Sequence, residues 1–493
     1  MPEAADSPNK EKKSENLPEP VEKIVQTHHT ATIGGESIAY TVTTGTILLK
    51  VEDEEKGEKA KAMVFFVAYT KDGVEEVSSR PLTFSFNGGP GSSSVWLHLG
   101  VLGPRRVLLD DEGMPLPPPA RLVNNDYSLL DHTDMVFIDP IGTGFSRSVP
   151  GEKAEQFHTF NEDINSVGEF IRLYVTRYKR WNSPKFLIGE SYGTTRAGGL
   201  AGYLQNRHGL YLNGIMLVSA VLNFQTIEML PGNDLPFILY LPVFAATAWY
   251  HKQLHQDLQE DLQRTLSEAE ALAMNEYTLA LMKGDKLSAS ERDTIAAKLA
   301  RYTGLSQDYI ERSNLRIDII RFCKELLRTQ RRTVGRLDSR FLGMDRDGVG
   351  EAFEYDPSYN GIAGAYTSAL NDYLRRDLNF ETDLPYEILS EKVYTAWKYD
   401  KHQNQYVNVA ETLRLAMTQN PFLKLFIANG YYDLATPYFA TDYTVAHLGL
   451  DPSLHGNVSM AYYEAGHMMY IHLPSLKRLK DDLTHFILSA TTR

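Results

Sequence analysis

The amino-acid sequence predicts a fold of the α/β class, with a mostly parallel central sheet flanked by helices. Short apolar runs without polar alternation, such as residues 135–139 and 214–219, are typical of strands buried on both faces of a parallel sheet. Helical segments such as residues 162–181 lie between these runs, and alternating strands and helices favour the α/β architecture. The length of 493 residues and the hydrophobic content of 43% allow one large core with insertions.

The chain begins with a segment, residues 1–25, that we expect to be a disordered tail. Most of this segment consists of Ala, Glu, Lys, Pro and Ser, and such a composition cannot bury enough apolar surface to fold. Alternating or continuous apolar runs after the tail predict the strands of the sheet in order. These strands lie at residues 38–44, 47–51, 63–69, 81–86, 135–139, 184–189 and 214–219.

The composition changes after residue 224. Residues 251–335 are rich in Leu, Glu, Gln, Ala, Lys and Arg at helical spacing and contain no convincing strand. Strand character returns at residues 424–429 and 458–463, and the chain closes with a helix over about 476–489. We therefore expect a core domain formed by residues 26–224 and 391–493. Residues 225–390 are expected to form a mainly helical insertion that caps the site.

Composition excludes several classes of function. The net charge of −13 and the lack of a dense basic stripe argue against nucleic-acid binding. No apolar run is long enough to cross a membrane, so we expect no membrane partner. The one cysteine, Cys323, excludes an intrachain disulfide, and its helical context favours a buried, inert thiol.

Metal and cofactor sites are not expected either. No group of His, Cys, Asp and Glu has the spacing of a zinc site. Residues 345–350 carry the first, third and sixth positions of a calcium-binding loop, but Val349 stands at the fifth and Asp356 at the last, so a polar loop is the favoured interpretation. The sequence leaves the oligomeric state open.

The strongest local motif is Gly-Glu-Ser-Tyr-Gly at residues 189–193. It matches G-x-S-x-G, follows a predicted strand and precedes a helix-like segment at 194–204. A sharp strand-to-helix turn lifts the Ser hydroxyl above the sheet, and glycines on either side relieve crowding. This context predicts an α/β-hydrolase fold with Ser191 as the nucleophile.

A nucleophilic serine needs a base, and the base needs a carboxylate that orients it. In this fold they follow in the order Ser, Asp, His, at the ends of later strands. Asp433 and His467 fit these positions, since each comes just after a predicted strand. His447 and His472 are weaker candidates for the base.

The oxyanion formed by such a nucleophile needs two backbone N–H groups. One is expected from Tyr192, the residue after the nucleophile. The other is expected from the glycine-rich loop at residues 87–94, which follows a predicted strand, with Gly89 as the donor. The loop lacks the Gly-Lys-Ser/Thr ending of a phosphate-binding loop, so nucleotide binding is not expected.

Five motifs in chain order resemble the signatures of the serine carboxypeptidases, peptidase family S10. These are Asn-Gly-Gly-Pro-Gly-Ser-Ser at 87–93, Asp-Pro-Ile-Gly-Thr-Gly-Phe-Ser at 139–146, Gly-Glu-Ser-Tyr-Gly at 189–193, Asn-Gly-Tyr-Tyr-Asp at 429–433 and Gly-His-Met at 466–468. The resemblance covers residues 80–225 and 420–470. The motifs resemble those of a divergent, bacterial-type member of the family.

The resemblance implies a peptide substrate with a free C-terminus, cleaved through a covalent acyl-enzyme. Members of the family hold the terminal carboxylate with residues that here are Asn87, Gly88 and Glu190. Two carboxylates in contact repel each other unless one is protonated, so binding is expected to be favoured at acidic pH. The family is mostly secreted or vacuolar, and although the chain shows no signal peptide, we expect a secreted or periplasmic location.

One departure from the family pattern leaves a second function open. The family usually carries another Glu two residues before Gly103-Pro104, where this chain has Val101. An esterase or acyltransferase that uses the same triad is therefore an alternative to a strict carboxypeptidase. A non-catalytic binding protein is a third possibility, although Ser191, Asp433 and His467 are all present.

Overall fold

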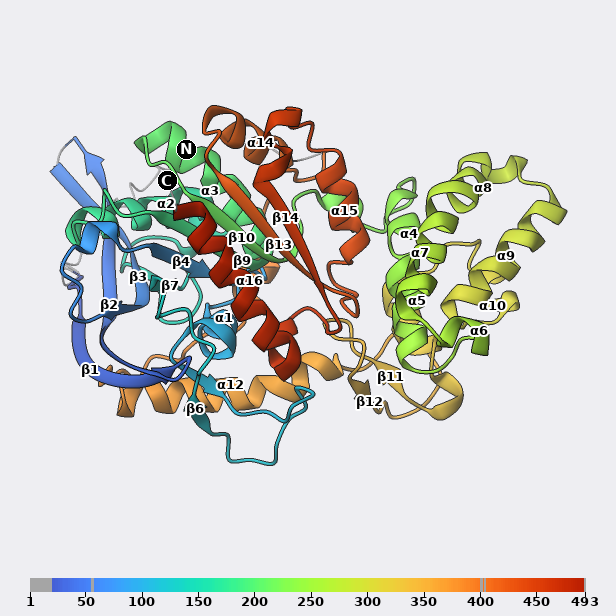
Figure 1. The fold of residues 1–493 in the computed structure, drawn as a ribbon, viewed down its shortest axis with the longest axis horizontal. Helices are drawn as coiled ribbons and strands as arrows, with labels where there is room; N and C mark the ends of the chain where they lie inside the picture. Colours follow the sequence, from blue (N-terminus) through green and yellow to red (C-terminus); the bar gives the residue numbers. More distant parts are fainter. Residues whose placement is uncertain (1–19, 55–56, 400–401, 403–404, 492–493) are drawn as a thin grey trace, which may run out of the picture.

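The computed structural model of the chain describes residues 20–491 except 55–56, 400–401 and 403–404. A 10-stranded sheet crosses the core in the order β1-β2-β3-β7-β4-β9-β10-β13-β14, with β8 paired to β3 (Figure 1). The strands are β1 Ile24–Ile33, β2 Glu36–Asp53, β3 Gly57–Lys71, β4 Leu82–Phe86, β7 Asp134–Ile138, β8 Arg147–Ser148, β9 Lys185–Ser191, β10 Gly214–Ala220, β13 Lys424–Gly430 and β14 Val458–Tyr463.

The sheet has an antiparallel part and a parallel part. The strands β1, β2, β3 and β7 pair antiparallel, whereas β7, β4, β9, β10, β13 and β14 all run parallel. The central strands are buried on both faces, as their continuous apolar runs predict. The predicted mostly parallel sheet is confirmed, and the carboxyl ends of β4, β9, β13 and β14 meet along one edge.

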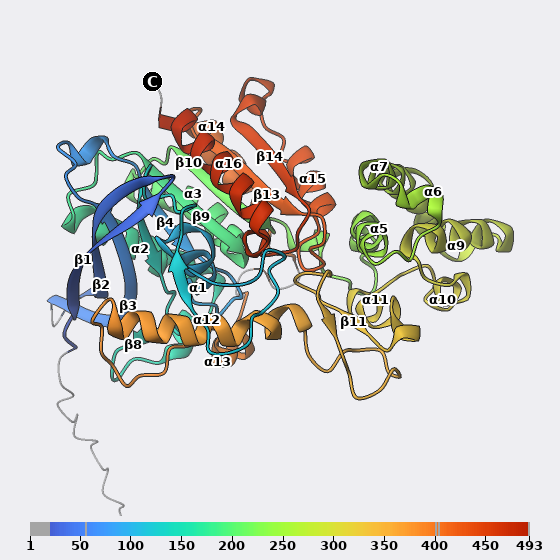
Figure 2. The ribbon, with the colours of Figure 1, turned by 60° about the horizontal axis from the view of Figure 1, so that its bottom comes forward.

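Helices cover both faces of the sheet and enclose a separate apolar cluster on each. On one face lie α2 (Phe160–Arg177), α3 (Tyr192–His208) and α14 (Ala410–Gln419). On the other lie the short α1 (Val95–Leu97), α12 (Pro357–Arg376) and α16 (Leu473–Thr491) (Figure 2). Successive residues of β9 alternate between these clusters, with Phe186 and Ile188 in one and Leu187 in the other.

Residues 235–330 form a helical cap to one side of the core (Figure 1). The cap has its own apolar cluster, which continues onto the core through Tyr432, Leu434 and Tyr438. The cap helices are α4 Leu235–Leu239, α5 Leu241–Tyr250, α6 Gln256–Gln259, α7 Leu262–Leu272, α8 Thr278–Lys283, α9 Ala289–Thr303, α10 Gln307–Arg312 and α11 Ile319–Glu325. The core also holds α13 Glu391–Ala396 and α15 Tyr438–Ala446. Two further pairs of short strands form hairpins: β5–β6 (Arg105–Val107, Leu122–Asn124) and β11–β12 (Thr333–Val334, Leu342–Gly343).

Two of the predicted domain boundaries are wrong. The strand β1 begins at Ile24, inside the expected tail of residues 1–25, because it pairs with β2 as far as Gly45. The expected cap of residues 225–390 is too long, because α12 packs into the apolar cluster of the core through side chains such as Tyr366 and Leu370. Residues 1–19 of the expected tail lie outside the described residues.

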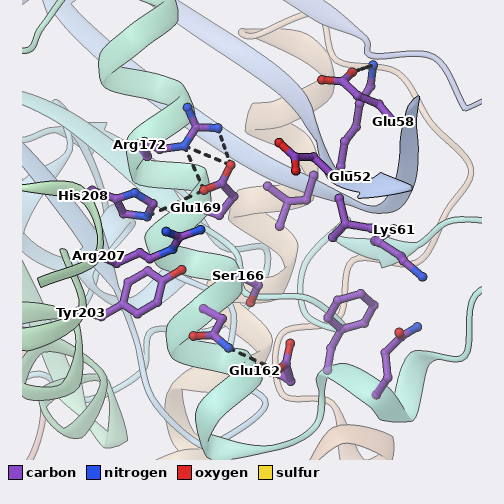
Figure 3. A pocket seen from close by; sticks show the side chains of 16 residues that line it. Glu52, Glu58, Lys61, Glu162, Ser166, Glu169, Arg172, Tyr203, Arg207 and His208 are labelled. Atoms are coloured by element: carbon purple, nitrogen blue, oxygen red, sulfur yellow. Dashed lines mark hydrogen bonds and ion pairs between the residues drawn. The ribbon is translucent and has the colours of Figure 1, made fainter. Parts of the chain in front are cut away.

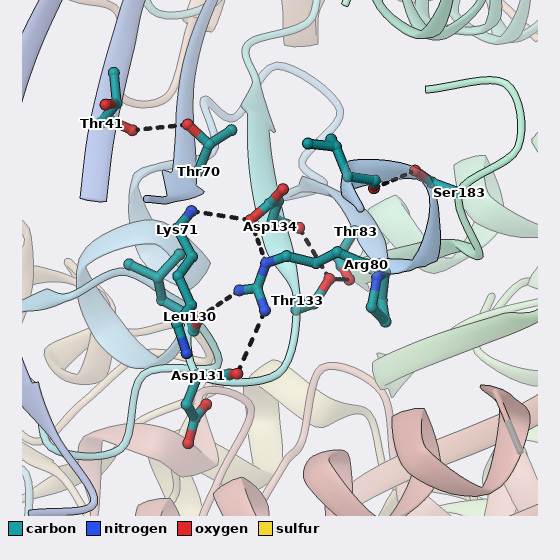
Figure 4. A network of polar contacts seen from close by, with 12 residues as sticks. Thr41, Thr70, Lys71, Arg80, Thr83, Leu130, Asp131, Thr133, Asp134 and Ser183 are labelled. Atoms are coloured by element: carbon teal, nitrogen blue, oxygen red, sulfur yellow. Dashed lines mark hydrogen bonds and ion pairs between the residues drawn. The ribbon is translucent and has the colours of Figure 1, made fainter. Parts of the chain in front are cut away.

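A buried ion cluster holds the amino ends of the parallel strands together. Asp134, the first residue of β7, accepts from Arg80 Nε at 2.6 Å and from the backbone N–H of Lys71 at 3.1 Å (Figure 4). It also accepts from Arg180 at 2.7 Å. Arg80 also donates to the carbonyl of Leu130 at 2.5 Å. These contacts tie the ends of β3, β4 and β7 to the segment after α2.

Within the described residues, no helix has the length and apolar character needed to span a bilayer.

The Asp134 cluster predicts a large stability effect. Asp134→Asn is expected to lower the free energy of unfolding by about 3–5 kcal/mol, since two buried guanidinium groups lose their shared anion. Urea unfolding measures this change. Asp372→Asn, which breaks the exposed Asp372–Arg376 pair, is the control and should leave the urea midpoint unchanged. Equal midpoints for the two variants would contradict the stabilising role of the cluster.

Candidate active site

Ser191 lies at the sharp turn between β9 and α3. Its backbone has φ 60° and ψ −132°, and α3 begins at the next residue, Tyr192. A Cβ atom at Gly189 would lie 2.2 Å from the carbonyl oxygen of Gly193, and one at Gly193 would lie 2.8 Å from that of Phe86. The turn therefore needs glycine at both positions, and a non-glycine residue with positive φ at its apex is the strained geometry of a nucleophile elbow.

Asp433 and His467 lie together at the ends of β13 and β14. His467 Nδ1 is 2.7 Å from Asp433 Oδ2, and both side chains are buried. Asp433 also accepts from Thr436 Oγ1 at 2.7 Å. The weaker candidates lie elsewhere: His447 Nδ1 contacts the carbonyl of its own helix at Tyr443 and His472 Nδ1 contacts Ser475.

The glycine-rich loop after β4 packs directly against the turn at Ser191. A Cβ atom at Gly88 would lie 2.4 Å from the backbone nitrogen of Tyr192 and 2.7 Å from that of Gly193. Gly89 has φ 102°, which also favours glycine. The loop and the start of α3 therefore approach more closely than side chains would allow, and their backbone N–H groups gather beside Ser191.

Buried polar contacts fix this loop in place. Asn87 Oδ1 accepts from the backbone N–H of Leu97 at 3.1 Å, and Arg196 donates to the carbonyl of Asn87 at 2.6 Å. Arg196 in turn pairs with Asp163 of α2 through contacts of 2.9 and 3.0 Å. At the far end of the loop, Asp139 accepts from the backbone N–H of Ser94 at 2.9 Å. The loop is thus held by α2, α3 and the end of β7.

Glu190 is a buried carboxyl group beside Ser191. Tyr470 donates a hydrogen bond to Glu190 Oε2 at 2.5 Å. Burial raises the pKa of Glu190 to about 7, against the opposing effects of His467 and of the Tyr470 hydrogen bond. Asn87 Nδ2 has no hydrogen-bond partner of good geometry among the described residues. The Asn87 side chain nevertheless lies close enough to Glu190 to oppose the effect of burial on the pKa of Glu190. The pair offers a neutral acid and an unused amide donor.

His467 responds to the same surroundings in the opposite way. Burial by itself would lower the pKa of His467, but the negative charges of Asp433 and Glu190 outweigh burial and raise it above its usual value. Protonation of Glu190 removes one of these charges. The two groups are therefore linked: an imidazole beside a neutral Glu190 loses its proton more readily than one beside an ionised Glu190.

Most of the predicted site residues line one cavity of about 560 Å³. The cavity contains Ser191, Glu190 and His467, and Asp433 lies behind the imidazole. Tyr192 contributes its backbone beside Ser191, while its ring packs in the apolar cluster under α2 and α3. The lining residues are Asn87, Gly88, Gly89, Ser92, Trp96, Glu190, Ser191, Ile320, Arg336, Leu337, Phe353, Asp356, Tyr359, Asn360, Leu389, Glu391, Tyr394, His467 and Met468.

A wider hollow of about 890 Å³ lies away from the triad, between α2, α3 and the β2–β3 ribbon. Its wall is mixed in charge: Glu169 pairs with Arg172, and Lys50 pairs with Glu58 (Figure 3). None of the eight predicted site residues lines it. We therefore assign the site to the smaller cavity, where the nucleophile, the imidazole and the buried acid converge.

The comparison with protein families identifies the family of this chain. The chain matches the family model described as serine carboxypeptidase over residues 53–470.

The chain belongs to the serine carboxypeptidase family.

Individual relatives match over shorter segments. Pheromone-processing carboxypeptidase KEX1 of Saccharomyces cerevisiae is 31% identical over 155 residues, which cover 30% of this chain and 20% of that protein. Serine carboxypeptidase-like 45 of Arabidopsis thaliana is 28% identical over 177 residues, which cover 34% of this chain and 35% of that protein. The aligned segments thus span about a fifth to a third of these relatives.

A solved structure carries the comparison over nearly the whole chain. The crystal structure of a prohormone-processing carboxypeptidase from Saccharomyces cerevisiae, Kex1(delta)p, superposes with a TM-score of 0.56 over 91% of each chain, at 17% sequence identity. The likeness is one of fold, and with the sheet order described above it confirms the α/β-hydrolase fold.

Two features noted in the sequence have structural explanations. Val101, where the family usually has Glu, is buried in the apolar cluster behind α1, so it adds no carboxyl group to the cavity beside Glu190. The loop at residues 345–350 is held by Lys324, which forms an ion pair with Asp345 and donates to the carbonyl of Asp347 at 3.1 Å. No group of metal-ligating side chains forms within the described parts of the chain.

Sequence analysis missed a segment that supports the loops of Asp433 and His467. Residues 335–341 connect the two short strands β11 and β12. The carbonyl of Leu337 accepts from the backbone N–H of His467 at 2.7 Å, and that of Arg336 accepts from Leu434 at 3.1 Å. Asp338 accepts from the backbone N–H of Gly466 at 3.1 Å. We call residues 335–341 the bracing segment, because it bonds to the loops that carry Asp433 and His467.

The charge of Asp338 is itself balanced by Arg340. Arg340 contacts both oxygens of Asp338, at distances of 2.7 to 3.2 Å, and both side chains are buried. A Cβ atom at Gly466 would lie 2.4 Å from Asp338 Cβ, so the glycine before His467 lets the segment approach.

Tyr470, the donor to Glu190, was also missed, because a tyrosine in an apolar run carries no signal of its own.

The bracing segment predicts a stability effect at the site. Asp338→Asn is expected to lower the free energy of unfolding by about 3–5 kcal/mol, because Arg340 would remain charged and buried without its anion. Unfolding in guanidinium chloride measures this change in the free energy of unfolding. Asp308→Asn, which breaks an exposed pair with Arg312, is the control and should leave the transition in place. A wild-type transition for Asp338→Asn would show that the buried pair is dispensable.

Proposed function

We propose that this protein is a serine-type carboxypeptidase that removes C-terminal residues through a covalent acyl-enzyme. The observation that carries the proposal is one cavity lined by Ser191, by His467 in contact with Asp433, and by a buried Glu190. The first two features supply nucleophilic catalysis, and the third supplies recognition of a free carboxylate.

In the acylation step, Ser191 Oγ attacks the scissile carbonyl carbon and His467 takes the hydroxyl proton. Asp433 stabilises the resulting imidazolium through the contact of 2.7 Å. The C–N bond of the tetrahedral intermediate then breaks, and His467 returns the proton to the leaving amino group. Water attacks the acyl-enzyme with His467 as base, which releases the shortened peptide and restores the Ser191 hydroxyl.

The oxyanion of each tetrahedral intermediate would be held by the backbone N–H groups of Gly89 and Tyr192. The close packing of Gly88 against the nitrogen of Tyr192 supports this assignment, because it brings the loop and the start of α3 together beside Ser191. Two fixed backbone donors in a site of low polarity stabilise negative charge strongly, since they need no reorganisation during the reaction.

The terminal carboxylate of the substrate would contact Asn87, Gly88 and Glu190. Asn87 Nδ2 is a buried donor that has no acceptor of good geometry among the described residues, and a substrate carboxylate would satisfy it. Glu190 can donate a hydrogen bond only in its protonated form, which its raised pKa of about 7 makes available at acidic pH. In its ionised form it would repel the substrate. These groups favour substrates with a free C-terminus at acidic pH.

The same linkage weakens the hold of the base on its proton in acid. When Glu190 is neutral, the imidazole of His467 loses one of the two charges that raise its pKa. A neutral imidazole is the form that can accept the proton of Ser191. Protonation of the carboxylate-binding acid thus favours substrate binding and limits the protonation of the base.

An esterase or acyltransferase is the second candidate, and Val101 is the observation that favours it. Because Val101 is buried in the apolar cluster, the second carboxyl group usual in the family is missing. A weaker grip on the terminal carboxylate would allow uncharged acyl donors. A non-catalytic binding protein is the weakest candidate, since it would not need a strained turn at Ser191 or a His467–Asp433 contact. The secreted or periplasmic location stays a prediction.

The main proposal is tested by comparing a peptide that has a free C-terminus with the same peptide as its C-terminal amide. Mass spectrometry at acidic pH should show stepwise loss of residues from the free acid and little loss from the amide. Ser191→Ala should lower the rate by at least roughly 10³-fold, since the nucleophile is removed. If both peptides stay intact while an activated ester is cleaved in a Ser191-dependent way, the esterase or acyltransferase candidate replaces the carboxypeptidase.

The role of Glu190 predicts a distinctive pH dependence of KM. For a free-acid peptide, KM should be low below about pH 7 and rise as pH passes through the pKa of Glu190, because the ionised group repels the substrate carboxylate. In Glu190→Gln the side chain stays neutral, so KM should be nearly constant between about pH 5 and pH 8.5. Initial rates at several substrate concentrations separate KM from kcat.

Asp442→Asn is the control for this experiment. Burial raises the pKa of Asp442 to about 6 as well, but its partner is Tyr462 and it does not line the cavity. This variant should keep the wild-type rise of KM with pH. The same rise in Glu190→Gln would rule out Glu190 as the titrating group.

A further inference from the structure

Arg336 contributes the one arginine or lysine among the described residues that line the cavity of Ser191. It belongs to the bracing segment, and its carbonyl accepts from the backbone N–H of Leu434, next to Asp433. Its backbone N–H donates to Asp356 Oδ1 at 3.2 Å. The backbone contacts fix where the side chain starts, so a substitution of the side chain leaves these contacts available.

The guanidinium group of Arg336 is half-buried. Among the residues that the structure describes, it forms no ion pair and donates no side-chain hydrogen bond. Other buried arginines of this protein are paired, including Arg196 with Asp163 and Arg340 with Asp338. An unpaired, half-buried guanidinium at a substrate cavity is costly to desolvate unless a ligand supplies an anion.

The acidic residues of the same cavity do not supply an anion that pairs with the Arg336 guanidinium. The carboxylate of Asp356 accepts from the backbone N–H of Arg336 and from both the N–H and the hydroxyl of Ser358, at the start of α12. Glu391 is exposed, in the first turn of α13. Glu190 is held by Tyr470. No carboxylate in the described ranges lies within ion-pair distance of the Arg336 guanidinium.

The rest of the wall is mainly apolar and aromatic. It includes Trp96, Ile320, Phe353 and Tyr359. Such a wall supplies contact area for a side chain but no charge of its own. A cation in this wall would discriminate between substrate side chains by their charge, because solvent screens its electrostatic contacts little there.

We propose that Arg336 recognises the side-chain carboxylate of the substrate's C-terminal residue, so that peptides ending in Glu or Asp are preferred. This inference rests on the proposed carboxypeptidase function. The main-chain carboxylate is taken up by Asn87, Gly88 and Glu190, which line the same cavity, so the side chain of that terminal residue extends into the remaining space, where Arg336 lies. The guanidinium fork matches a carboxylate with two parallel hydrogen bonds.

The test uses peptides that are identical except for a C-terminal Glu, Gln or Lys. For wild type, kcat/KM should be higher for the Glu peptide than for the Gln peptide. In Arg336→Gln the ratio of the two values should fall by roughly 10- to 100-fold, as for loss of a hydrogen-bonded charge pair. In Arg336→Glu the preference should turn toward the Lys peptide. Arg376→Gln, at an exposed arginine outside the cavity, is the control and should keep the wild-type ratio.

Two outcomes would overturn the proposal. If Arg336→Gln lowers kcat/KM equally for the Glu and Gln peptides, Arg336 contacts the main-chain carboxylate and does not read the side chain. If the ratio changes only for Glu at the penultimate position, the assignment to the terminal residue is wrong. Cleavage of the Gln peptide by wild type, measured in parallel, separates these results from failure of the proposed function, which would leave every peptide intact.

Discussion

The close approach of two backbone turns is the constraint on which the site depends. The glycine-rich loop after β4 and the turn between β9 and α3 meet where a Cβ atom at Gly88 would lie 2.4 Å from the nitrogen of Tyr192. Gly189 and Gly193 meet the same requirement on the other side of Ser191. Backbone donors, nucleophile and buried acid can share one small volume only because no side chain separates the two turns. The ion pair of Arg196 with Asp163, both buried, holds this contact from below.

Burial then sets the chemistry of the groups that gather there. Glu190 and His467 are both shielded from water, yet their pKa values move for different reasons. Glu190 is shifted mainly by burial and becomes a neutral donor near pH 7, whereas His467 is governed by the anions beside it, above all Asp433. A single low-polarity site thus shifts the pKa values of both groups in the directions that the proposed mechanism uses. Tyr470 joins the two parts, since it follows His467 by three residues and donates to Glu190.

Much of this could be predicted from the sequence, because the residues concerned follow strands. Parallel strands present their carboxyl ends at one edge, so motifs after β4, β9, β13 and β14 had to converge. The contributions of the bracing segment could not be predicted. Asp338 and Arg336 come from an irregular connection between two-residue strands, where no periodic pattern marks the fold. The boundary of the cap was missed for a related reason: α12 has the same helical pattern as the cap helices, and only packing places Tyr366 in the core.

The bracing segment also couples the cap to the catalytic loops. It follows the last cap helix, its carbonyls bond to the loops of Asp433 and His467, and its one unpaired cation lies in the wall of the cavity. Backbone contacts of this kind do not depend on side-chain identity, so the segment can hold the triad while its side chains vary. Under the proposed role of Arg336, specificity could therefore change there without a change at Leu337, whose carbonyl supports His467. The bracing segment thereby combines, in one short connection, support for the loops of Asp433 and His467 with a side chain in the cavity wall.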